Sequence, residues 1–404
     1  MEFFKYTLPN GIRCIYKRVK SPVAWCAMTI NAGSRDELTS QYGAAHFTEH
    51  LLFKGTEKRR AHHINNRLEK LGGELNAFTT KEETVVHATV LKGDIPKAAE
   101  LISDVVFHSV FPAKEVERER EVILDEINSY KDSPPDRIYD EFEDMLFAGS
   151  SLGHDILGTR STVGRLGRDD ISGFTGRTYN TDQMVFSLVG NLTEKSFLRI
   201  VERYFADMAR SEREFVRQLP EDAAVFEKAI NRNTYQAHCI LGNRAYGNSD
   251  PRRIVMSLLI NILGGPAANS KLNTLLREKN GLTYNAEASY TPYCDTGIAA
   301  IYFGSEKDKV QICIELIDGL LTGLKDRRLT GRQLAAAKKQ FIGQLAVSME
   351  NREGYMLSAG KSLLVYDDVD TPEMIYRKIE AITAADIMEV ANEVFGQTSK
   401  LIYR

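Results

Sequence analysis

An internal repeat is the feature of this sequence that most constrains its fold. Matching short runs occur in both halves: Arg67-Leu68-Glu69-Lys70 then Leu75-Asn76-Ala77, and Arg277-Glu278-Lys279 then Tyr284-Asn285-Ala286. The helical patterns that follow them, at about 113–130 and 333–345, also align, at a shift of 218 residues. Because similarity at a fixed spacing is typical of a duplicated unit, the sequence predicts two similar halves.

Hydrophobic periodicity gives each half both strands and helices. Alternating or short apolar runs predict strands at 3–8, 12–17, 24–30, 74–80, 84–91, 184–189, 235–241, 283–290 and 297–303. Helical spacing predicts helices at 61–71, 94–110, 113–130, 137–147, 194–208, 252–263 and 271–279, and from residues 307, 332, 354 and 384 onward. The two halves are therefore expected to be mixed α/β structures.

A polar stretch at 209–228 is the best candidate for a linker between the halves. It contains Pro220 and has no clear periodicity. A chain of 404 residues is also too long for one ordinary domain. We therefore predict one domain at 1–208, the linker at 209–228, and a homologous domain at 229–404.

Charge and cysteine content exclude several classes of protein. A net charge of −3 gives no overall field that would attract nucleic acid or an anionic membrane. The five cysteines include no Cys-x-x-Cys pair, which argues against a disulfide framework and fits a reducing compartment. The chain starts with strand-like alternation at Met1-Glu2-Phe3-Phe4, without a signal peptide, and contains no apolar run of 18 residues. We therefore expect a soluble cytoplasmic protein with no nucleic-acid and no membrane partner.

The segment 43–56 carries the strongest chemical signal. If it is helical, as its Ala, Leu and Phe content suggests, His46 and His50 lie four residues apart on one face, and Glu49 borders that face. A catalytic zinc needs such a set: two neutral nitrogen ligands and a base for its water. The order His-x-x-Glu-His is the inverted form of the commoner His-Glu-x-x-His zinc helix.

The alternative is that this histidine pair is only polar surface. The acidic helix expected at 113–130 would likewise usually be a solvated face. Two of its acids, Glu119 and Glu126, are seven residues apart and therefore share one face. In the repeat they fall on Ala337 and Gln344, so the second half copies the architecture without these acids.

Several motifs follow the order found in the pitrilysin, insulin-degrading enzyme and mitochondrial processing peptidase family, which the chain resembles over nearly its whole length. They are His46-Phe47-Thr48-Glu49-His50-Leu51-Leu52-Phe53-Lys54-Gly55-Thr56, Gly72-Gly73-Glu74-Leu75-Asn76-Ala77, Glu119-Arg120 with Val122-Ile123 and Glu126-Ile127, Leu263-Gly264-Gly265, and Leu276-Arg277-Glu278-Lys279-Asn280-Gly281-Leu282-Thr283-Tyr284. The length resembles that of the short, two-domain, bacterial-type members. The resemblance implies an α+β fold of two structurally similar mixed α/β halves, each a mostly antiparallel sheet covered by helices, as in metallohydrolases of the mitochondrial processing peptidase type.

The resemblance also implies a zinc metalloendopeptidase with one Zn²⁺ per chain. His46, His50 and Glu126 would be its ligands, which is the composition of a hydrolytic zinc site. Glu49 would be the general base, taking a proton from the zinc-bound water and then protonating the leaving amine. Glu119 would orient a ligand from behind, unless it is an ordinary exposed glutamate.

A substrate-binding edge strand is implied at 74–78. Such a strand binds an extended peptide by main-chain hydrogen bonds. Gly73, Asn76 and Ala77 are the positions carried over from the family. Phe78 would either line a pocket or belong to the core.

Arg277 and Tyr284 match the family's Arg/Tyr pair in the half without metal. Both side chains are donors suited to a substrate carbonyl and a tetrahedral oxyanion. In the family this pair faces the zinc from the opposite wall of a closed chamber. For a two-domain chain that wall would belong to a second subunit, so we expect a homodimer that acts on peptides at sites completed in trans.

A non-catalytic or processing-peptidase-like assembly subunit of the same fold is the alternative function. Such a subunit would normally lack one of His46, Glu49, His50 or Glu126, and all four are present. Substrate preference stays open at this stage. Pro266 stands where related chains commonly have a small residue, which leaves the shape of its loop open as well.

Overall fold

The chain folds into two compact units, each assembled from three segments. The computed structural model describes residues 3–221 and 224–404. Two short stretches lie outside the described residues. Residues 1–2 belong to the N-terminal segment predicted to lack a signal peptide, and residues 222–223 belong to the predicted linker. The first unit contains the chain up to residue 128, with 154–218 and 348–370; the second contains 129–153, 219–347 and 371–404.

The first unit is built on a six-stranded sheet in the order β1-β2-β6-β3-β5-β4. Neighbouring strands are antiparallel except β2 and β6, which are parallel. β4 is an edge strand, pairing among the described strands only with β5. The strands are β1 (Phe4–Thr7), β2 (Arg13–Arg18), β3 (Val23–Ile30), β4 (Glu74–Thr79), β5 (Thr84–Leu91) and β6 (Met184–Gly190).

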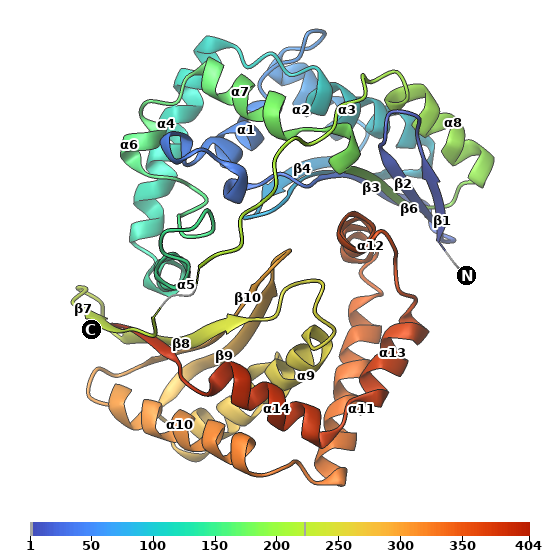
Figure 1. Ribbon diagram of the computed structural model, residues 1–404. Coiled ribbons are helices and arrows are strands. Elements are labelled where there is room, and N and C mark those ends of the chain that lie inside the picture. Colours follow the sequence, from blue (N-terminus) through green and yellow to red (C-terminus); the bar gives the residue numbers. More distant parts are fainter. Residues whose placement is uncertain (1–2, 222–223) are drawn as a thin grey trace. The chain divides into compact units, whose positions relative to one another are not determined.

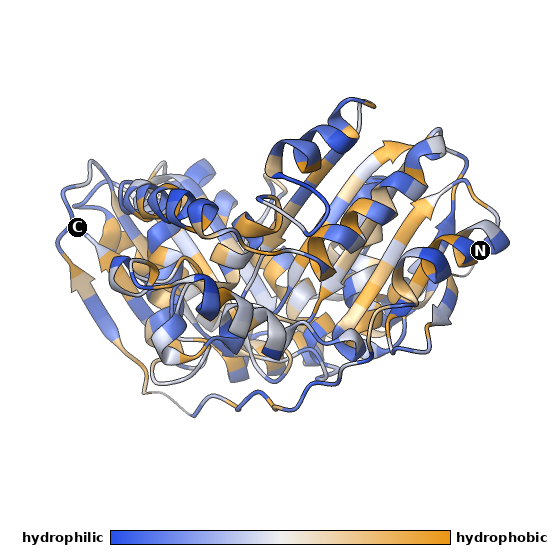
Figure 2. Ribbon diagram, turned by 90° about the horizontal axis from the view of Figure 1, so that it is seen from above, coloured by the Kyte–Doolittle hydropathy of each residue, from blue (hydrophilic) through white to orange (hydrophobic). Residues whose placement is uncertain are grey.

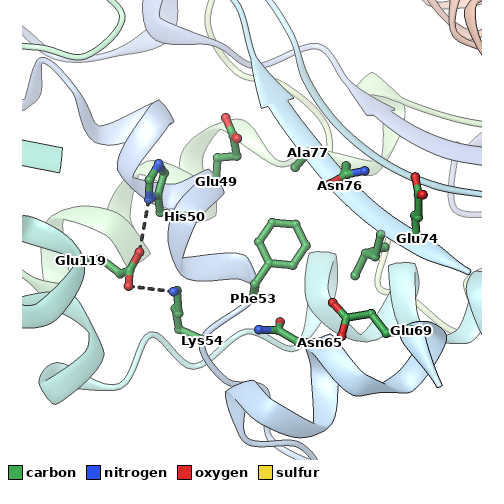
Figure 3. A pocket seen from close by; sticks show the side chains of 11 residues that line it. Glu49, His50, Phe53, Lys54, Asn65, Glu69, Glu74, Asn76, Ala77 and Glu119 are labelled. Carbon is green, nitrogen blue, oxygen red and sulfur yellow. Dashed lines mark hydrogen bonds and ion pairs between the residues drawn. The ribbon is translucent and has the colours of Figure 1, made fainter. Parts of the chain in front are cut away.

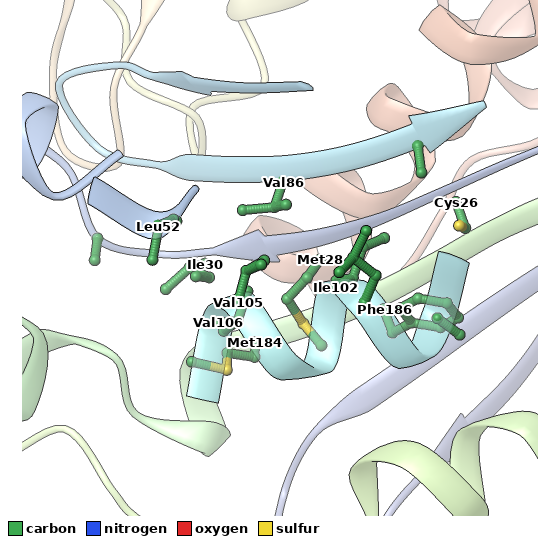
Figure 4. Packing of buried hydrophobic residues seen from close by; sticks show 14 of the residues in the cluster. Cys26, Met28, Ile30, Leu52, Val86, Ile102, Val105, Val106, Met184 and Phe186 are labelled. Atoms are coloured by element: carbon green, nitrogen blue, oxygen red, sulfur yellow. The ribbon is translucent and has the colours of Figure 1, made fainter. Parts of the chain in front are cut away.

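Helices cover both faces of this sheet, because successive strand residues place apolar side chains on opposite sides. Met28, Val86 and Phe186 join the main core beneath α3 (Figure 4). Ile15 and Val185 point to the other face, against α12. The helices are α1 (Ala44–Leu52), α2 (Ala61–Glu69), α3 (Ile95–Phe107), α6 (Arg160–Val163), α7 (Arg168–Thr178), α8 (Glu194–Phe205), α12 (Arg352–Tyr366) and most of α4 (Ala113–Lys131), with 3₁₀ turns at Ser34–Asp36, Thr39–Gln41, Lys92–Asp94 and Thr181–Gln183.

The second unit repeats this arrangement with a five-stranded sheet in the order β7-β11-β8-β10-β9. Its strands are β7 (Glu227–Ile230), β8 (Ala237–Ala245), β9 (Thr283–Pro292), β10 (Gly297–Ser305) and β11 (Ser399–Tyr403). β7 and β11 are parallel and the other pairs antiparallel. Without β1, the first sheet has the same order and directions, so the prediction of an α+β fold with two similar halves is confirmed.

Helices also cover both faces of the second sheet (Figure 1). α9, α10 and α14 pack on one face, and α5 packs on the other through Ile138 and Phe142. The helices are α5 (Pro134–Leu146), α9 (Arg253–Gly264), α10 (Val310–Asp326), α11 (Gly331–Ser348), α13 (Pro372–Ala381) and α14 (Ala384–Phe395), with a π-helix at Asn273–Lys279.

The two halves of the sequence exchange one helix. α5 follows α4 in the first half but packs on the second sheet, whereas α12 follows α11 in the second half but packs on the first sheet. The predicted division at 208 and 229 follows the order of the sequence, whereas the compact units are interleaved because of this exchange.

Five helices and strands do not appear among the predicted ones: α6, α7, α13, β7 and β11. α7 contains Gly173 and Gly176, which lower helix propensity, and β7 and β11 are short. In Figure 2 apolar residues concentrate along strands, while the surface helices carry many polar residues. None of the described helices is both long enough and apolar enough to cross a membrane.

Candidate metal centre

The first turn of α1 carries His46 and starts in an uncommon way. Gly43 has the left-handed φ of 97°. A Cβ at this position would lie 2.7 Å from the carbonyl oxygen of Leu157, so only glycine fits. Because glycine has no capping side chain, a residue of the preceding loop supplies the cap: the Glu37 carboxylate accepts the backbone N–H of Gly43 at 2.9 Å and of Ala45 at 2.7 Å.

Replacing Gly43 with Ala should destabilise the protein by roughly 2–4 kcal/mol, from the left-handed backbone and the clash with Leu157. Urea denaturation of the metal-free protein measures this. Gly173→Ala in α7 is the matched control, since no neighbouring atom lies within 4 Å of its Cβ position. Equal stability of the two variants would contradict the steric argument.

Three metal-binding side chains from two helices come together beside this turn. The Nε2 atoms of His46 and His50 lie 3.8 and 3.7 Å from Oε2 of Glu126. A ligand atom from each of the three residues lies within 4.8 Å of the others. The acidic helix α4 therefore brings Glu126 to the face of α1 that carries both histidines.

The three side chains fit a zinc ion. Zinc bonds of about 2.0–2.2 Å place the ligand atoms of a tetrahedral site roughly 3.4 Å apart. The separations of 3.7 and 3.8 Å exceed this by only a few tenths of an ångström, which small side-chain rotations remove. Three protein ligands also leave a fourth position for water or substrate.

Burial tunes the protonation of two groups at this site. It lowers the pKa of His46 to about 3, with a smaller contribution from the charge of His50, so His46 is the neutral ligand form near pH 7. Burial raises the pKa of Glu49, and the charge of Glu126 adds to the increase, while Thr79 and His50 oppose it. A raised pKa makes the Glu49 carboxylate a better proton acceptor than an exposed glutamate.

A chain of contacts holds His50 from behind (Figure 3). Nδ1 of His50 lies 3.2 Å from Oε2 of Glu119, and the other oxygen of Glu119 lies 2.7 Å from Nζ of Lys54. A carboxylate on Nδ1 directs the Nε2 lone pair toward Glu126. The structure thus places Glu119 beside His50, and it adds Lys54 to the contacts of this carboxylate.

The site opens onto a groove of about 510 Å³ whose opposite side is β4. Figure 3 shows Glu49 and His50 on one side, and Asn76 and Ala77 on the edge strand. Glu69 of α2 also lines the groove. An unpaired strand edge beside a candidate metal site can bind a peptide main chain within reach of Glu49.

The other two residues predicted on the substrate strand have different surroundings. The Phe78 ring packs on the face covered by α12, with its centroid 6.0 Å from that of His87. Gly73 precedes β4, and a Cβ there would lie 2.8 Å from Cγ1 of Val90. The groove therefore includes Asn76 and Ala77, whereas Phe78 does not line it and is partly buried against the cluster on the α12 face.

Arg277 and Tyr284 lie together in the second unit. The Arg277 guanidinium is 5.4 Å from the centre of the Tyr284 ring, and Tyr284 is 83% exposed. Both line a groove of about 620 Å³ beside β9, the edge strand of the second sheet. Pro266 lines the same groove.

The second unit has an amide pair where the repeat places Glu126. Gln344 of α11 accepts a hydrogen bond from Nδ2 of Asn261 in α9, with an N···O distance of 2.7 Å. An amide pair satisfies itself and is a poor zinc ligand set. The repeated architecture is therefore retained with different chemistry.

Sequence reasoning missed three residues around this site: Glu37, Lys54 and His154. Lys54 lies within the motif, four residues after His50, so helical spacing offered a signal for it. Glu37 and His154 contact each other at 3.0 Å across 117 residues, and no local pattern in the sequence indicates that pair.

Comparison with known proteins finds two matching family models and relatives that are named zinc proteases. The family described as insulinase (peptidase family M16) matches residues 13–160, and that described as the peptidase M16 inactive domain matches residues 165–341. A protein of Streptomyces coelicolor named an uncharacterized zinc protease is 32% identical, over 98% of this chain and 88% of its own. A Bacillus subtilis protein with the same description is 31% identical, over 97% of this chain and 96% of its own.

Solved structures share the fold. A protease from Helicobacter pylori has a TM-score of 0.91 at 20% identity, covering 100% of this chain and 99% of its own. A structure described as the peptidase M16 inactive domain from Pseudomonas fluorescens has a TM-score of 0.92 at 20% identity, covering 100% and 98%. At such identity the similarity concerns the fold alone.

Proposed function

The chain belongs to the insulinase family of peptidases (M16), which confirms the resemblance drawn from its motifs, and we propose that it is a zinc-dependent endopeptidase for short, unstructured peptides. The observation that carries this proposal is the cluster of His46, His50 and Glu126, with Glu49 beside it, opening onto a groove with a free strand edge. One zinc ion per chain is proposed.

Each residue of the cluster has a proposed role. His46, His50 and Glu126 would hold the zinc ion. When bound by three protein ligands, zinc would supply a water whose pKa is lowered to about 7 and would polarise a substrate carbonyl. The Glu49 carboxylate accepts the proton of the attacking water and delivers it to the nitrogen of the leaving amine. Its raised pKa supports both transfers, since the protonated form must persist until the amine leaves.

The edge strand β4 would select the substrate. A peptide that adds to this edge must be extended and accessible, which a folded protein is not. Asn76 and Ala77, which line the groove, would contact it most closely, and Gly73 would allow close approach at the strand's start. Phe78 would support the strand from the face covered by α12.

We also propose a homodimer, in which Arg277 and Tyr284 of a second copy close the chamber over the zinc half. Their exposed donors, in a unit that lacks the zinc ligands, support this arrangement. The proposed catalytic domain is 1–208, and 229–404 would carry the Arg/Tyr pair. The five cysteines, which all lie among the described residues, form no disulfide there, and this supports a cytoplasmic location.

Removing the metal tests the proposed activity. The wild-type protein, incubated with a peptide library and mapped by mass spectrometry, should cut internal bonds. Dialysis against a chelator should abolish cleavage, and one equivalent of Zn²⁺ per chain should restore it. Stoichiometric zinc binding without any cleavage would instead indicate a non-catalytic assembly subunit.

Replacing Glu119 with Gln should weaken zinc binding about 10–100-fold, since the ring of His50 loses a charged partner. Competition with a chromophoric chelator measures the affinity. Glu117→Gln, an exposed acid on the same helix, is the control. Equal affinities of the two variants would contradict a role for Glu119 in orienting His50.

A further inference from the structure

A buried glutamate that the proposed reaction does not use lies at the start of α1. The Glu37 side chain is fully buried. Its Oε2 accepts the N–H of Gly43 and lies 3.0 Å from Nε2 of His154, and its Oε1 accepts the N–H of Ala45. The His154 ring is also buried and stacks on Tyr42, with ring centroids 3.7 Å apart.

These contacts explain how a carboxylate is tolerated in this position. A buried acid is costly unless hydrogen bonds and charges compensate it. Glu37 receives two N–H groups from the free end of a helix, where a negative charge is also favourable. The compensation thus comes from the first turn of α1 together with the positive charge of Lys81. In return, the first turn gains the only carboxylate cap supplied to it within the described residues.

The first turn matters most for one ligand, His46. His46 is the third residue of α1 and follows Ala45 directly. Among the described residues no hydrogen-bond partner contacts its buried Nδ1. His50, one turn later, is held by Glu119. The position of the His46 ring therefore depends on the backbone of the first turn, and that backbone depends on Glu37.

We propose that Glu37 and His154 are a positioning pair that holds the first turn of α1 and thereby the metal-binding position of His46. This inference rests on the proposed zinc site. Glu37 acts on His46 indirectly, through the backbone of the first turn. Glu119, in contrast, acts on His50 by direct side-chain contact. His154 acts one step further away, by fixing the Glu37 carboxylate.

Hydrogen exchange of the metal-free protein, followed by mass spectrometry, tests the capping step without reference to zinc. In Glu37→Gln the amides of residues 43–46 should exchange at least tenfold faster than in the wild type, because an amide nitrogen replaces one acceptor. His154→Ala should give a smaller increase, and His154→Gln should reverse much of it, since its side-chain amide can donate to Glu37. The double variant Glu37→Gln/His154→Ala should match Glu37→Gln alone.

Zinc affinity, measured by chelator competition on the same proteins, tests the link to His46. Glu37→Gln should weaken binding about 10–100-fold, in the range of residues that orient metal ligands. Asp36→Asn is the matched control: this neighbouring acid is equally buried but pairs with Arg217 rather than with α1. Its zinc affinity should stay within threefold of the wild type.

Several outcomes would overturn the inference. Unchanged exchange at 43–46 in Glu37→Gln would remove the capping role, and faster exchange with unchanged zinc affinity would remove the link to His46. If Glu37→Gln does not fold, the His154 variants replace it in the test. Wild-type zinc affinity in both of them would then remove the link to His46. Failure of the wild type to bind zinc would refute the proposed function instead, while the exchange data would still decide whether the pair holds the first turn.

Discussion

Replacing Glu49 with Gln should lower the rate of peptide hydrolysis by roughly 10²–10⁴-fold, the usual contribution of a positioned acid–base group, while zinc remains bound. Gln fills the same space but cannot accept or deliver the proton. His46, His50 and Glu126 are untouched, so one zinc per chain should be retained. Because burial raises the pKa of Glu49, a neutral amide should be tolerated there without loss of stability.

The measurement pairs a rate with a metal analysis. Cleavage of a quenched peptide and zinc content are recorded on the same preparation, with Glu69→Gln as a control on the other side of the groove. The control should retain wild-type cleavage, because Glu69 is exposed and lies on α2. Hydrolysis by Glu49→Gln within tenfold of the wild type would assign the base elsewhere, and loss of zinc would assign the effect to metal binding.

The sequence predicts those parts of the centre that follow from local spacing. His46, Glu49 and His50 occupy about one turn of a helix, so helical periodicity alone predicts that they share a face. Glu119 and Glu126 share a face of α4 for the same reason. That α4 packs with this face toward α1 depended on the family resemblance, because tertiary packing is not encoded in helical spacing.

Features that depend on contacts distant in sequence could not be predicted. The exchange of α5 and α12 leaves the order of elements unchanged, so a periodicity analysis assigns each helix to its own half. The Glu37 cap of α1 is close in sequence but also could not be predicted, because capping patterns assume a side chain on the N-cap residue, which here is Gly43. Phe78 has an apolar side chain that suits either a pocket or the core, and only strand register decides between them.

The duplicated architecture gives a physical reason to expect a shared active site. The second unit repeats the sheet, the edge strand and the long helix, yet it has Gln344, paired with Asn261, where the repeat places Glu126. The second unit also carries two exposed donors, the cationic Arg277 and the phenolic Tyr284. It does not repeat the metal-binding residues of the first unit beside them. Donors of this kind stabilise an oxyanion only when they face a reacting carbonyl.

Mixing the Glu49→Gln and Arg277→Ala proteins should therefore restore activity that neither has alone. If each site combines the zinc half of one chain with the Arg/Tyr half of the other, a mixed dimer contains one site with both residues intact. It should show about half the activity of a wild-type dimer, and random mixing should give about a quarter overall, since half of the dimers are mixed. Differently tagged chains allow mixed dimers to be isolated before the assay.

The matched control is a mixture of Arg277→Ala with Tyr284→Phe. Both substitutions lie in the same unit, so every dimer formed has one defect in each site and no wild-type site arises. This mixture should show only the average of its parents, whereas the first should exceed both parents manyfold. Isolated mixed dimers of Glu49→Gln and Arg277→Ala that remain as inactive as their parents would place both residues of a site in one chain, and the trans arrangement would be wrong. Recovery in the first mixture alone would establish that the wall facing the zinc belongs to the partner, because two chains with separate defects can complement only across their interface.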